Sequence, residues 1–266
     1  MLMKSIIRKI YDQISSIKRV FIYPYWFVIK LLYRIRVFNT SDIPVIINNF
    51  NRLTFPVQLI EFLEYCGFRK IIIIDNNSTY PPLLEFYKSC NHKVLRFQDN
   101  YGHLSLWKSG IYKKYMWNYF VYTDSDVLPI EECPKDFINH FRKILDHYYK
   151  LDKIGFGIKI DDLPEKFKFK DKIINYEKEY WKNEISANIF EASIDTTFAL
   201  YKPFSNLKKG QIHTLKAFRT GYPFLIRHLP WYVDLENLSD EEKYYMLTCN
   251  NSSSIGKQLK GNDAVY

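Results

Sequence analysis

Two short apolar runs frame one amphipathic helix near the start of the chain, and this order constrains the fold more than any other feature. The runs are residues 43–47 and 70–74, and their isoleucine and valine content is typical of strands buried on both faces. Between them, apolar residues recur at helical spacing from Thr54 to Cys66, and Gly67 follows where a helix end is expected. The sequence therefore predicts a strand–helix–strand unit of a parallel sheet.

A third predicted strand ends in the most informative motif of the chain. Residues 118–123 are aromatic and β-branched, Asp124-Ser125-Asp126 follows directly, and Pro129 prevents the strand from continuing. Open α/β sheets bind their ligands outside the carboxyl ends of the strands. Two carboxylates at such an end can bind one Mg²⁺ or Mn²⁺ ion, because these cations prefer oxygen ligands and bridge carboxylates to phosphates. The alternative interpretation is a solvated acidic turn.

Polar residues also follow the other predicted strands. They form the runs Asn48-Asn49-Phe50-Asn51-Arg52, Asp75-Asn76-Asn77-Ser78-Thr79 and Asn100-Tyr101-Gly102. In this order and spacing, together with the motif at residues 124–126, they resemble the GT-A glycosyltransferases, close to family 2. The resemblance covers residues 43–130 and continues less specifically through residues 194–201 and 227–232. It departs from the family at Asn48-Asn49, where a Pro-Thr or Pro-Val pair is usual.

The resemblance implies a fold and a domain organisation. The fold would be an α/β, Rossmann-like GT-A domain, with a mixed, mostly parallel sheet flanked by helices. Residues 39–266 would form this catalytic domain, and residues 1–38 would form a basic, aromatic-rich helical segment ahead of it. The length and the hydrophobic content of 47% are sufficient for one domain with a sizeable core.

The resemblance also implies a function, which is metal-dependent transfer of a sugar from a UDP-sugar or another nucleotide-diphosphate donor. The acceptor would be a glycan or a lipid-linked glycan in cell-surface polysaccharide synthesis. The residues implied to bind the donor are Asn49, Asn51, Arg52, Asp75, Asn77, Asn100, Gly102, Asp124 and Ser125. The residues implied to hold Mn²⁺ or Mg²⁺ are Asp124, Asp126 and His228. Asp75 could instead form a turn through its side chain, and His228 could be a hydrogen-bonded structural histidine.

An acceptor hydroxyl needs a base if the transfer inverts the anomeric carbon. Asp195 is our choice, because it lies in a predicted apolar strand, residues 192–201, where an unpaired carboxylate is costly. A hydrogen bond to Thr196 or Thr197 at the strand end would leave Asp195 without a catalytic role. If the transfer retains configuration, Asp195 would instead stabilise an oxocarbenium-like state. The alternative bases are Asp161, Asp162 and Glu191.

The remaining elements follow from hydrophobic spacing and turn residues. Helices are expected at residues 82–90, 103–117 and 137–148 and from Ser239, and strands at residues 93–97, 154–160 and 224–227. Residues 161–185 are rich in charge and predict an irregular loop, whose place after a strand suits a flap over the acceptor. Arg219 and Arg227 could each pair with a diphosphate through two hydrogen bonds, or each could form an ordinary ion pair.

Positive charge is concentrated at the start of the chain. Residues 1–38 carry eight basic side chains and one acid, which accounts for seven of the net charge of +9. Their uncharged run, residues 20–29, is about half the length that a membrane-spanning helix needs. The segment is therefore expected either to lie on an anionic membrane surface through its basic and aromatic side chains, or to pack against protein. No nucleic-acid-binding motif is present, so nucleic acid is not an expected partner.

Cysteine spacing and glycine content bear on the location and on a rival function. The four cysteines have no C-x-x-C spacing, which is typical of reduced thiols, so we expect a cytoplasmic protein, peripheral on the inner face of the membrane. The rival function is a nucleotidyltransferase that makes an activated sugar on a related fold. Enzymes of that class have a glycine-rich, basic signature after the first strand, and residues 48–52 contain no glycine. A non-catalytic sugar-binding module would not need Asp124 and Asp126 beside Asp75.

Overall fold

The computed structural model describes residues 28, 40–203, 205 and 215–249. The chain divides into two compact units, Met1–Asn39 and Thr40–Tyr266. The helical segment predicted for residues 1–38 lies outside the described residues apart from Val28, so its structure and its membrane contact stay predictions. Among the described residues, no helix combines the length and the apolar character needed to cross a membrane.

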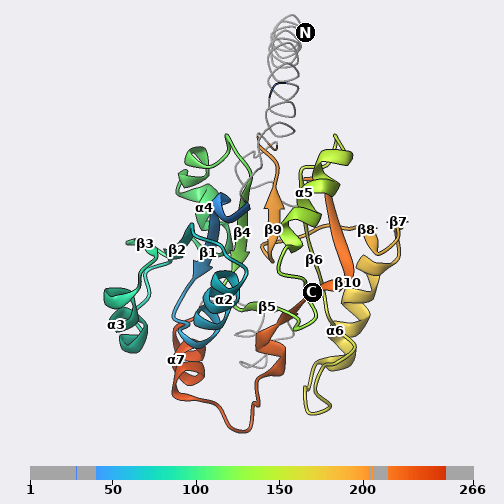
Figure 1. Cartoon of the computed structure of the whole chain (residues 1–266). Helices are drawn as coiled ribbons and strands as arrows, with labels where there is room; N and C mark the ends of the chain where they lie inside the picture. The colour runs from blue at the N-terminus through green and yellow to red at the C-terminus, as the bar shows by residue number, and fades with distance from the viewer. Residues whose placement is uncertain (1–27, 29–39, 204, 206–214, 250–266) are drawn as a thin grey trace, which may run out of the picture. The chain divides into compact units, whose positions relative to one another are not determined.

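A ten-stranded sheet forms the centre of the second unit (Figure 1). Across the sheet the strand order is β3-β2-β1-β4-β9-β6-β10-β8-β7, and β5 pairs with β10 outside this path. The strands are β1 (Val45–Asn49), β2 (Ile71–Asp75), β3 (Lys93–Arg96), β4 (Phe120–Asp124), β5 (Val127–Pro129), β6 (Lys153–Ile158), β7 (Glu184–Ser186), β8 (Ile189–Glu191), β9 (Ala199–Tyr201) and β10 (Ala217–His228).

Most strands of this sheet run in one direction. β1 is parallel to β2 and β4, β2 is parallel to β3, and β6 is parallel to β10. β9 lies antiparallel between β4 and β6, so β6 and β10 point the same way as β4. β5 and β8 are antiparallel to β10, and β7 is antiparallel to β8. The predicted mixed, mostly parallel α/β sheet is therefore confirmed for the described residues, and the carboxyl ends of β1, β2 and β4 meet at one edge.

Helices flank the sheet, with α3 beside its β3 edge and α6 beside its opposite half (Figure 1). Gly67, just after α2, has a left-handed backbone with a φ of 85°, which disfavours any residue with a side chain. α7 begins after Ser239, whose hydroxyl accepts a hydrogen bond from Glu242 N, while the Glu242 carboxylate accepts one from Ser239 N. The helices are α2 (Thr54–Tyr65), α3 (Pro81–Ser89), α4 (Ser105–Lys108), α5 (Phe137–His147), α6 (Lys170–Glu177) and α7 (Asp240–Thr248).

The core consists of aliphatic strands covered by aromatic side chains. All five residues of β2 are buried, as expected for a parallel strand covered on both faces. Trp107 packs edge-on against Tyr122 with ring centroids 4.7 Å apart, and Phe120 stacks on Tyr201 at 5.0 Å. These contacts join β4, the strand that ends at Asp124, to α4 and to its neighbour β9.

Two sequence predictions of secondary structure were wrong because backbone and tertiary contacts override local pattern. The helix predicted at residues 103–117 is broken into α4 and two 3₁₀ turns, and Gly110 with a φ of 76° separates α4 from the second turn. The irregular loop predicted at residues 161–185 contains α6 and the 3₁₀ turn Lys178–Trp181. Buried Ile173 anchors α6, and a 25-residue window rich in charge hid this short apolar stripe.

The predicted strand at residues 192–201 was also wrong over most of its length. Only β9, Ala199–Tyr201, is a strand, and residues 192–198 cross the end of β4 as a loop. The reason is a backbone hydrogen bond of 3.1 Å from Asp124 N to Thr196 O, which takes this segment out of the ladder. β10 is longer than the predicted strand at residues 224–227, because its first half pairs with β8.

Candidate active site

A cavity of about 480 Å³ opens at the carboxyl ends of β1, β2 and β4 and extends under α6 and β10. Its walls combine carboxylates, amides and aromatic rings, and no single element supplies more than a few of them. The lining residues used below come from the strand exits (Asn48, Phe50, Arg52, Asn76, Asn100, Gly102, Asp124, Ser125 and Asp126), from α6 and the turn after it (Tyr176, Glu177 and Tyr180), and from late segments (Ser193, Asp195, Thr196, Arg219, His228, Trp231 and Tyr245).

The structure brings eight of the predicted site residues to this cavity. They are Arg52, Asn100, Gly102, Asp124, Ser125, Asp126, Asp195 and His228. Four predicted donor-binding residues do not line it, namely Asn49, Asn51, Asp75 and Asn77. The proposed roles of all twelve stay predictions, but their positions separate them into two groups with different surroundings.

The acidic pair stands at the exit of β4, as the sequence predicts. Asp124 Oδ2 accepts a hydrogen bond of 2.6 Å from the Thr196 hydroxyl, and Ser125 between the two acids is 5% exposed. Burial raises the pKa of Asp124 well above its ordinary value, and the neighbouring Asp126 carboxylate raises it further. A divalent cation would reverse both effects, because it neutralises charge where two carboxylates repel each other.

His228 lies beside the acidic pair, at the end of β10. Its Nε2 is 3.7 Å from Asp126 Oδ2, and its Nδ1 is buried without a hydrogen-bond partner in the described part of the chain. Burial lowers the pKa of His228, which favours the neutral imidazole that can ligate a metal. Carboxylate oxygens with one imidazole suit Mn²⁺, so the donor set fits the predicted cation.

The predicted set of Asp124, Asp126 and His228 is nevertheless not a preassembled metal centre. Among the described residues, no three histidine, cysteine, aspartate or glutamate side chains stand close enough together to hold an ion by themselves. Magnesium-type cations commonly use one or two carboxylates and complete their coordination with waters and substrate phosphates. An ion held by Asp124 and Asp126 would therefore need further ligands from water or from a bound molecule.

Arg52 is a buried cation with no hydrogen-bond partner for two of its nitrogens among the described residues. The residue is 5% exposed, and both Nε and Nη1 are buried and unsatisfied. The guanidinium lies 3.8 Å from the ring centroid of Tyr245 on α7, and this cation–π contact offsets part of its desolvation. Because an unpaired buried charge is costly, the arrangement favours an anionic ligand in the cavity.

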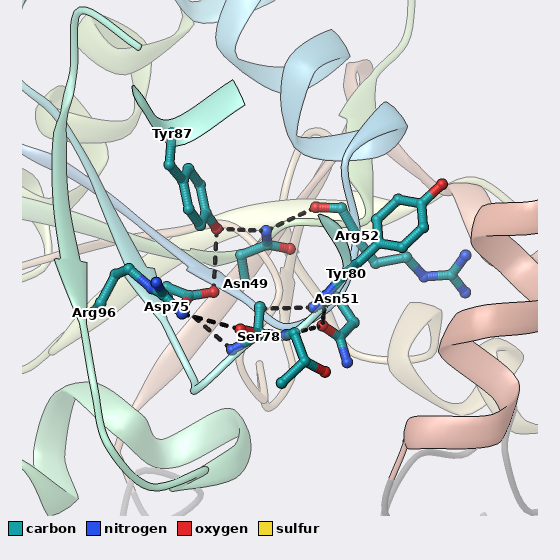
Figure 2. A network of polar contacts seen from close by, with 9 residues as sticks. Asn49, Asn51, Arg52, Asp75, Ser78, Tyr80, Tyr87 and Arg96 are labelled. Atoms are coloured by element: carbon teal, nitrogen blue, oxygen red, sulfur yellow. Dashed lines mark hydrogen bonds and ion pairs between the residues drawn. The ribbon is translucent and has the colours of Figure 1, made fainter. Parts of the chain in front are cut away.

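Asn51 and Asp75 are not in the cavity lining and belong instead to a separate polar network (Figure 2). The Asp75 side chain is fully buried, and its carboxylate accepts hydrogen bonds from Ser78 N at 3.2 Å and Arg96 Nε at 3.1 Å. Asn51 Oδ1 accepts from the backbone nitrogens of residues 79 and 80, at 2.7 Å and 3.0 Å. Figure 2 also shows the Arg52 side chain leaving this network rather than joining it. The network holds the loops after β1 and β2 together.

The asparagines of this network have a second, conformational reason for their positions. Asn51 and Asn77 have φ values of 48° and 62°, in the left-handed region that asparagine tolerates better than most residues. Asn49, two residues before Asn51, adds side-chain hydrogen bonds, because its Nδ2 donates to Arg52 O at 2.8 Å and to Tyr87 Oη at 3.0 Å. Turn geometry therefore accounts for part of the motif that the sequence presents at both strand exits.

Asn100 and Gly102 line the cavity beside the exits of β1 and β2. Gly102 has a φ of 69°, and its N donates to Asn100 Oδ1 at 2.8 Å. Asn76 Nδ2 donates to Asn48 Oδ1 at 2.6 Å, and both asparagines also reach the Gly102 carbonyl at 3.4 Å. This wall presents amides and backbone groups to the cavity, which are suited to recognise a neutral polar ring.

Asp195 is exposed on the loop before β9 and lines the cavity. Its exposure corrects the physical reason for choosing it, because the carboxylate is not trapped in an apolar strand. The rival bases are held elsewhere: Asp162 accepts from Arg227 Nε and Tyr232 Oη at 2.8 Å and 2.5 Å, and Glu191 pairs with Lys216 at 2.9 Å. Asp161, Asp162 and Glu191 do not line the cavity, so Asp195 is the one of the four candidate carboxylates that reaches it.

The two late arginines are not available for a diphosphate. Arg219 Nη1 pairs with Glu177 Oε2 at 2.7 Å, and both side chains are nearly buried. Arg227 pairs with Asp162 and with Glu131, at 2.8 Å and 3.1 Å. Both therefore follow the ion-pair alternative. Arg52 also lines the cavity, and two of its nitrogens have no hydrogen-bond partner among the described residues.

Sequence reasoning missed several residues that line the cavity. Tyr176 and Tyr180 lie on α6 and the turn after it, in a segment expected to be irregular, and Tyr245 lies on α7. Their only sequence signal is aromatic spacing of four residues at 176 and 180, which is also common in cores. Asn48 and Asn76 were within the quoted motifs and could have been chosen from their places directly at the strand exits.

Comparisons with known proteins find only distant structural likenesses. No family model matches the chain, and no curated protein matches it. Among solved structures, S. aureus TarS 1–349 is similar at 14% identity and a TM-score of 0.40, covering 70% of this chain and 59% of that one. GalNAc-T7, solved with UDP, GalNAc and Mn²⁺, is similar at 11% identity and a TM-score of 0.42, covering 70% and 43%.

A cytidylyltransferase from Leptospira borgpetersenii is also similar, at 12% identity and a TM-score of 0.32, covering 53% of this chain and 72% of that one. This chain thus spans less than two thirds of TarS 1–349 and of GalNAc-T7. At these TM-scores and identities the likenesses do not establish a function, and the function must be inferred from the cavity itself.

Proposed function

We propose that the protein is a metal-dependent glycosyltransferase that uses a nucleotide-diphosphate sugar, with UDP as the expected nucleotide. The observation that carries this proposal is that one cavity joins an acidic pair, an unpaired buried arginine and an exposed carboxylate. The acidic pair suits a cation, and the arginine suits a diphosphate. The exposed carboxylate suits a base, so the three features together match the parts of a sugar-transfer site.

The chain's own residues would bind the leaving group before the reaction. Arg52 would donate its Nε and Nη1 hydrogens to diphosphate oxygens, which satisfies the nitrogens that otherwise lack partners. Asp124 and Asp126, with His228 beside them, would hold Mn²⁺ or Mg²⁺. When bound, that cation would supply Lewis-acid stabilisation of the charge on the departing diphosphate. Asn49, Asn51, Asp75 and Asn77 stay predicted nucleotide residues, and the hydrogen bonds of the first three point to support of the loops.

The reaction would exchange one bond to the anomeric carbon for another. The bond from that carbon to the diphosphate oxygen breaks, and its electron pair leaves with UDP. A new bond forms from the acceptor oxygen to the anomeric carbon, and the acceptor's proton passes to an oxygen of Asp195 in an inverting transfer. General-base catalysis of this kind contributes about 10²–10⁴-fold to the rate.

The test is a product analysis with a panel of UDP-sugars in the presence of Mn²⁺. The proposal predicts slow release of UDP with water as acceptor, and faster release when a suitable glycan is added. A parallel incubation with UTP and sugar 1-phosphates tests the nucleotidyltransferase alternative, which would release pyrophosphate. Pyrophosphate without any UDP release would overturn the proposal, and so would the absence of both products.

We further propose that residues 1–38 bring the enzyme to an anionic membrane surface on the cytoplasmic side, where a lipid-linked acceptor would be found. The support is the charge of +7 and the aromatic residues of this segment. Each basic residue near such a surface contributes about 1 kcal/mol, and added salt weakens the attraction. Sedimentation with phosphatidylserine vesicles should show binding that salt and deletion of residues 1–38 both remove. Intact protein that stays in solution at low salt would contradict this proposal.

A further inference from the structure

The cavity has a second half that the donor-binding proposal does not use. It is lined by α6 and the turn after it, by the start of β10 and by the loop before β9, and its main residues are Tyr176, Glu177, Tyr180, Ser193 and Arg219. We propose that this half is the acceptor subsite, and that it binds an uncharged sugar ring against Tyr176 and Tyr180. The inference rests on the proposed function, because it assigns the second substrate of the same reaction.

The charges of this half cancel within the protein. Arg219 Nη1 and Glu177 Oε2 are 2.7 Å apart, and their side chains are 6% and 5% exposed. Arg219 Nε also donates to Ser193 O at 2.8 Å, so the guanidinium has two protein partners. Arg52 in the other half has unsatisfied nitrogens, which is the opposite condition. A phosphate or an ammonium group would therefore gain little here, and a neutral ligand is favoured.

The two tyrosine rings supply a surface suited to a sugar. Their centroids are 5.4 Å apart with an angle of 76° between the planes, and the Tyr180 hydroxyl donates to the Tyr176 hydroxyl at 2.7 Å. The Arg219 guanidinium covers Tyr180 at 3.9 Å from the ring centroid and so fixes its orientation. Tyrosine combines an apolar ring with a polar tip, and a pyranose likewise combines C–H faces with a hydroxyl rim.

Gly157 leaves room for Trp181, the residue that follows Tyr180. A Cβ atom at Gly157 on β6 would lie 2.4 Å from Trp181 Cη2 and 2.5 Å from Thr220 O. The absence of a side chain therefore lets Trp181 pack directly on the sheet, where it also meets Phe190 edge-on at 5.0 Å. Trp181 follows Tyr180 directly, so this contact sets the position of the tyrosines above the end of the sheet.

The loop before β9 connects this half to the donor half. Ser193 O accepts from Arg219, and three residues later the Thr196 hydroxyl donates to Asp124 Oδ2 at 2.6 Å. Asp195 stands between these two anchor points and lines the same cavity. A sugar held by the tyrosines would therefore present its hydroxyls on the side of the proposed base, with the donor on the other side.

The experiment measures two ligands independently on the full-length protein. Saturation-transfer NMR with methyl β-D-glucopyranoside, methyl β-D-galactopyranoside and methyl β-D-galactopyranosiduronate reports binding of neutral and charged rings, in the presence of UDP and the diamagnetic cation Mg²⁺. Titration calorimetry with UDP and Mn²⁺ reports the donor half. The variants are Tyr176→Leu, Tyr180→Leu and Tyr180→Phe, and Tyr149→Leu serves as the matched control, because Tyr149 is 65% exposed and outside the cavity.

The proposal predicts that at least one neutral glycoside binds and that the uronate binds more weakly. Tyr176→Leu and Tyr180→Leu should each weaken neutral-glycoside binding about tenfold, which is the expected scale for loss of an aromatic contact. Tyr180→Phe and Tyr149→Leu should retain it, and UDP affinity should be unchanged in all four variants.

The acceptor assignment is overturned if no neutral glycoside binds to the wild-type protein, or if both leucine variants bind it as the wild type does. Stronger binding of the uronate would also overturn it, because the half would then prefer a charged ring. A wild-type protein that binds a glycoside but not UDP would support the sugar subsite while contradicting the proposed donor. The two proposals can therefore fail separately.

Discussion

Two groups of polar residues lie at or near the strand exits, and one member of each, Asn51 and Arg52, is adjacent in sequence, yet the fold uses the two groups in opposite ways. The scaffold network consists of Asn51, Asp75, Ser78, Tyr87 and Arg96, and its hydrogen bonds are made inside the protein. The cavity cluster consists of Arg52, Asp124, Asp126 and His228, and it contains unsatisfied nitrogens and carboxylates that repel each other. Adjacent Asn51 and Arg52 fall on opposite sides of this division.

The difference indicates which residues are available to bind a ligand. A network that satisfies its own donors and acceptors contributes to stability and leaves little to offer a substrate. A cluster left with buried, unpaired groups lowers stability, and such groups persist where binding a ligand compensates them. The comparison therefore predicts that substitutions in the two groups will separate stability from binding.

The largest effect is expected at Asp195, where the two substrates would meet. Asp195→Asn should slow UDP-sugar turnover by about 10²–10⁴-fold, since the acceptor's proton would lose its base. Because Asp195 is exposed and outside the cavity cluster, the affinity for UDP should stay unchanged in calorimetry. A variant with near-normal turnover would remove Asp195 from the mechanism, and the same substitution at Asp162 would then be the control to examine.

Lys153 gives a second contrast with Arg52, because it is also a buried cation but has protein partners. Its Nζ donates to Ile194 O at 2.5 Å and to Asp195 O at 3.3 Å, which supports the loop before β9. Burial lowers the pKa of Lys153 from 10.5 to about 8, with the Arg219 charge acting in the same direction and the Asp195 and Asp152 carboxylates opposing it. The charged form is therefore less favourable in the folded than in the unfolded protein.

Because of this pKa shift, the free energy of unfolding should change with pH above pH 8. Below that pH both states hold the proton, and the full cost of the buried charge is present. Between pH 8 and 10.5 the unfolded state binds more protons, so the free energy of unfolding should rise, by up to about 3 kcal/mol from this group. Urea unfolding from pH 7 to 10 measures the rise, and Lys153→Met should remove it. An identical pH profile in the variant would show that Lys153 is not the source.

Arg52→Gln should separate binding from stability. The affinity for UDP should fall about 10–100-fold, which is the scale for losing hydrogen bonds from a charged group. The melting temperature should stay the same or rise, because the substitution removes an uncompensated buried charge. Calorimetry and thermal unfolding on one sample give both values. A large loss of stability with unchanged UDP affinity would move Arg52 into the scaffold network.

Asp75→Asn should show the reverse pattern, with the smallest effect on binding. Asp75 bonds Ser78 N, Tyr87 Oη and Arg96 Nε, and replacing its carboxylate should lower the free energy of unfolding by about 1–3 kcal/mol. UDP affinity of the folded variant should change less than in Arg52→Gln. A tenfold or larger loss of affinity in a stable variant would instead support the nucleotide contact that the sequence predicts for Asp75.

Part of the fold and of the candidate site could be predicted from the sequence. The strand–helix–strand unit and the place of Asp124 and Asp126 were predictable, because parallel strands have continuous apolar runs and their exits share one edge of the sheet. The different surroundings of Asn51 and Arg52 were not predictable. Asn51 forms hydrogen bonds with Thr79, Tyr80 and Thr248, and Thr248 lies 197 positions further along the chain.

The second half of the cavity could not be predicted from the sequence, for a similar reason. Tyr176 and Tyr180 are placed by the packing of Trp181 over Gly157, and nothing near residue 157 in sequence indicates that contact. Asp195 was chosen for its apparent place in an apolar strand, and the structure puts it in an exposed loop instead. The position of the loop depends on the Thr196 hydrogen bonds to Asp124, which join residues 72 positions apart.

The central claim is that the cavity cluster binds a diphosphate together with a divalent cation. Calorimetric titration of UDP, with Mn²⁺ and then with EDTA, tests it most directly in the wild type and in the Asp124→Ala/Asp126→Ala double variant. We expect wild-type affinity to fall about tenfold or more in EDTA, and the double variant to bind weakly in both conditions while remaining folded by circular dichroism. Tight UDP binding in EDTA that is unchanged in the double variant would contradict the claim.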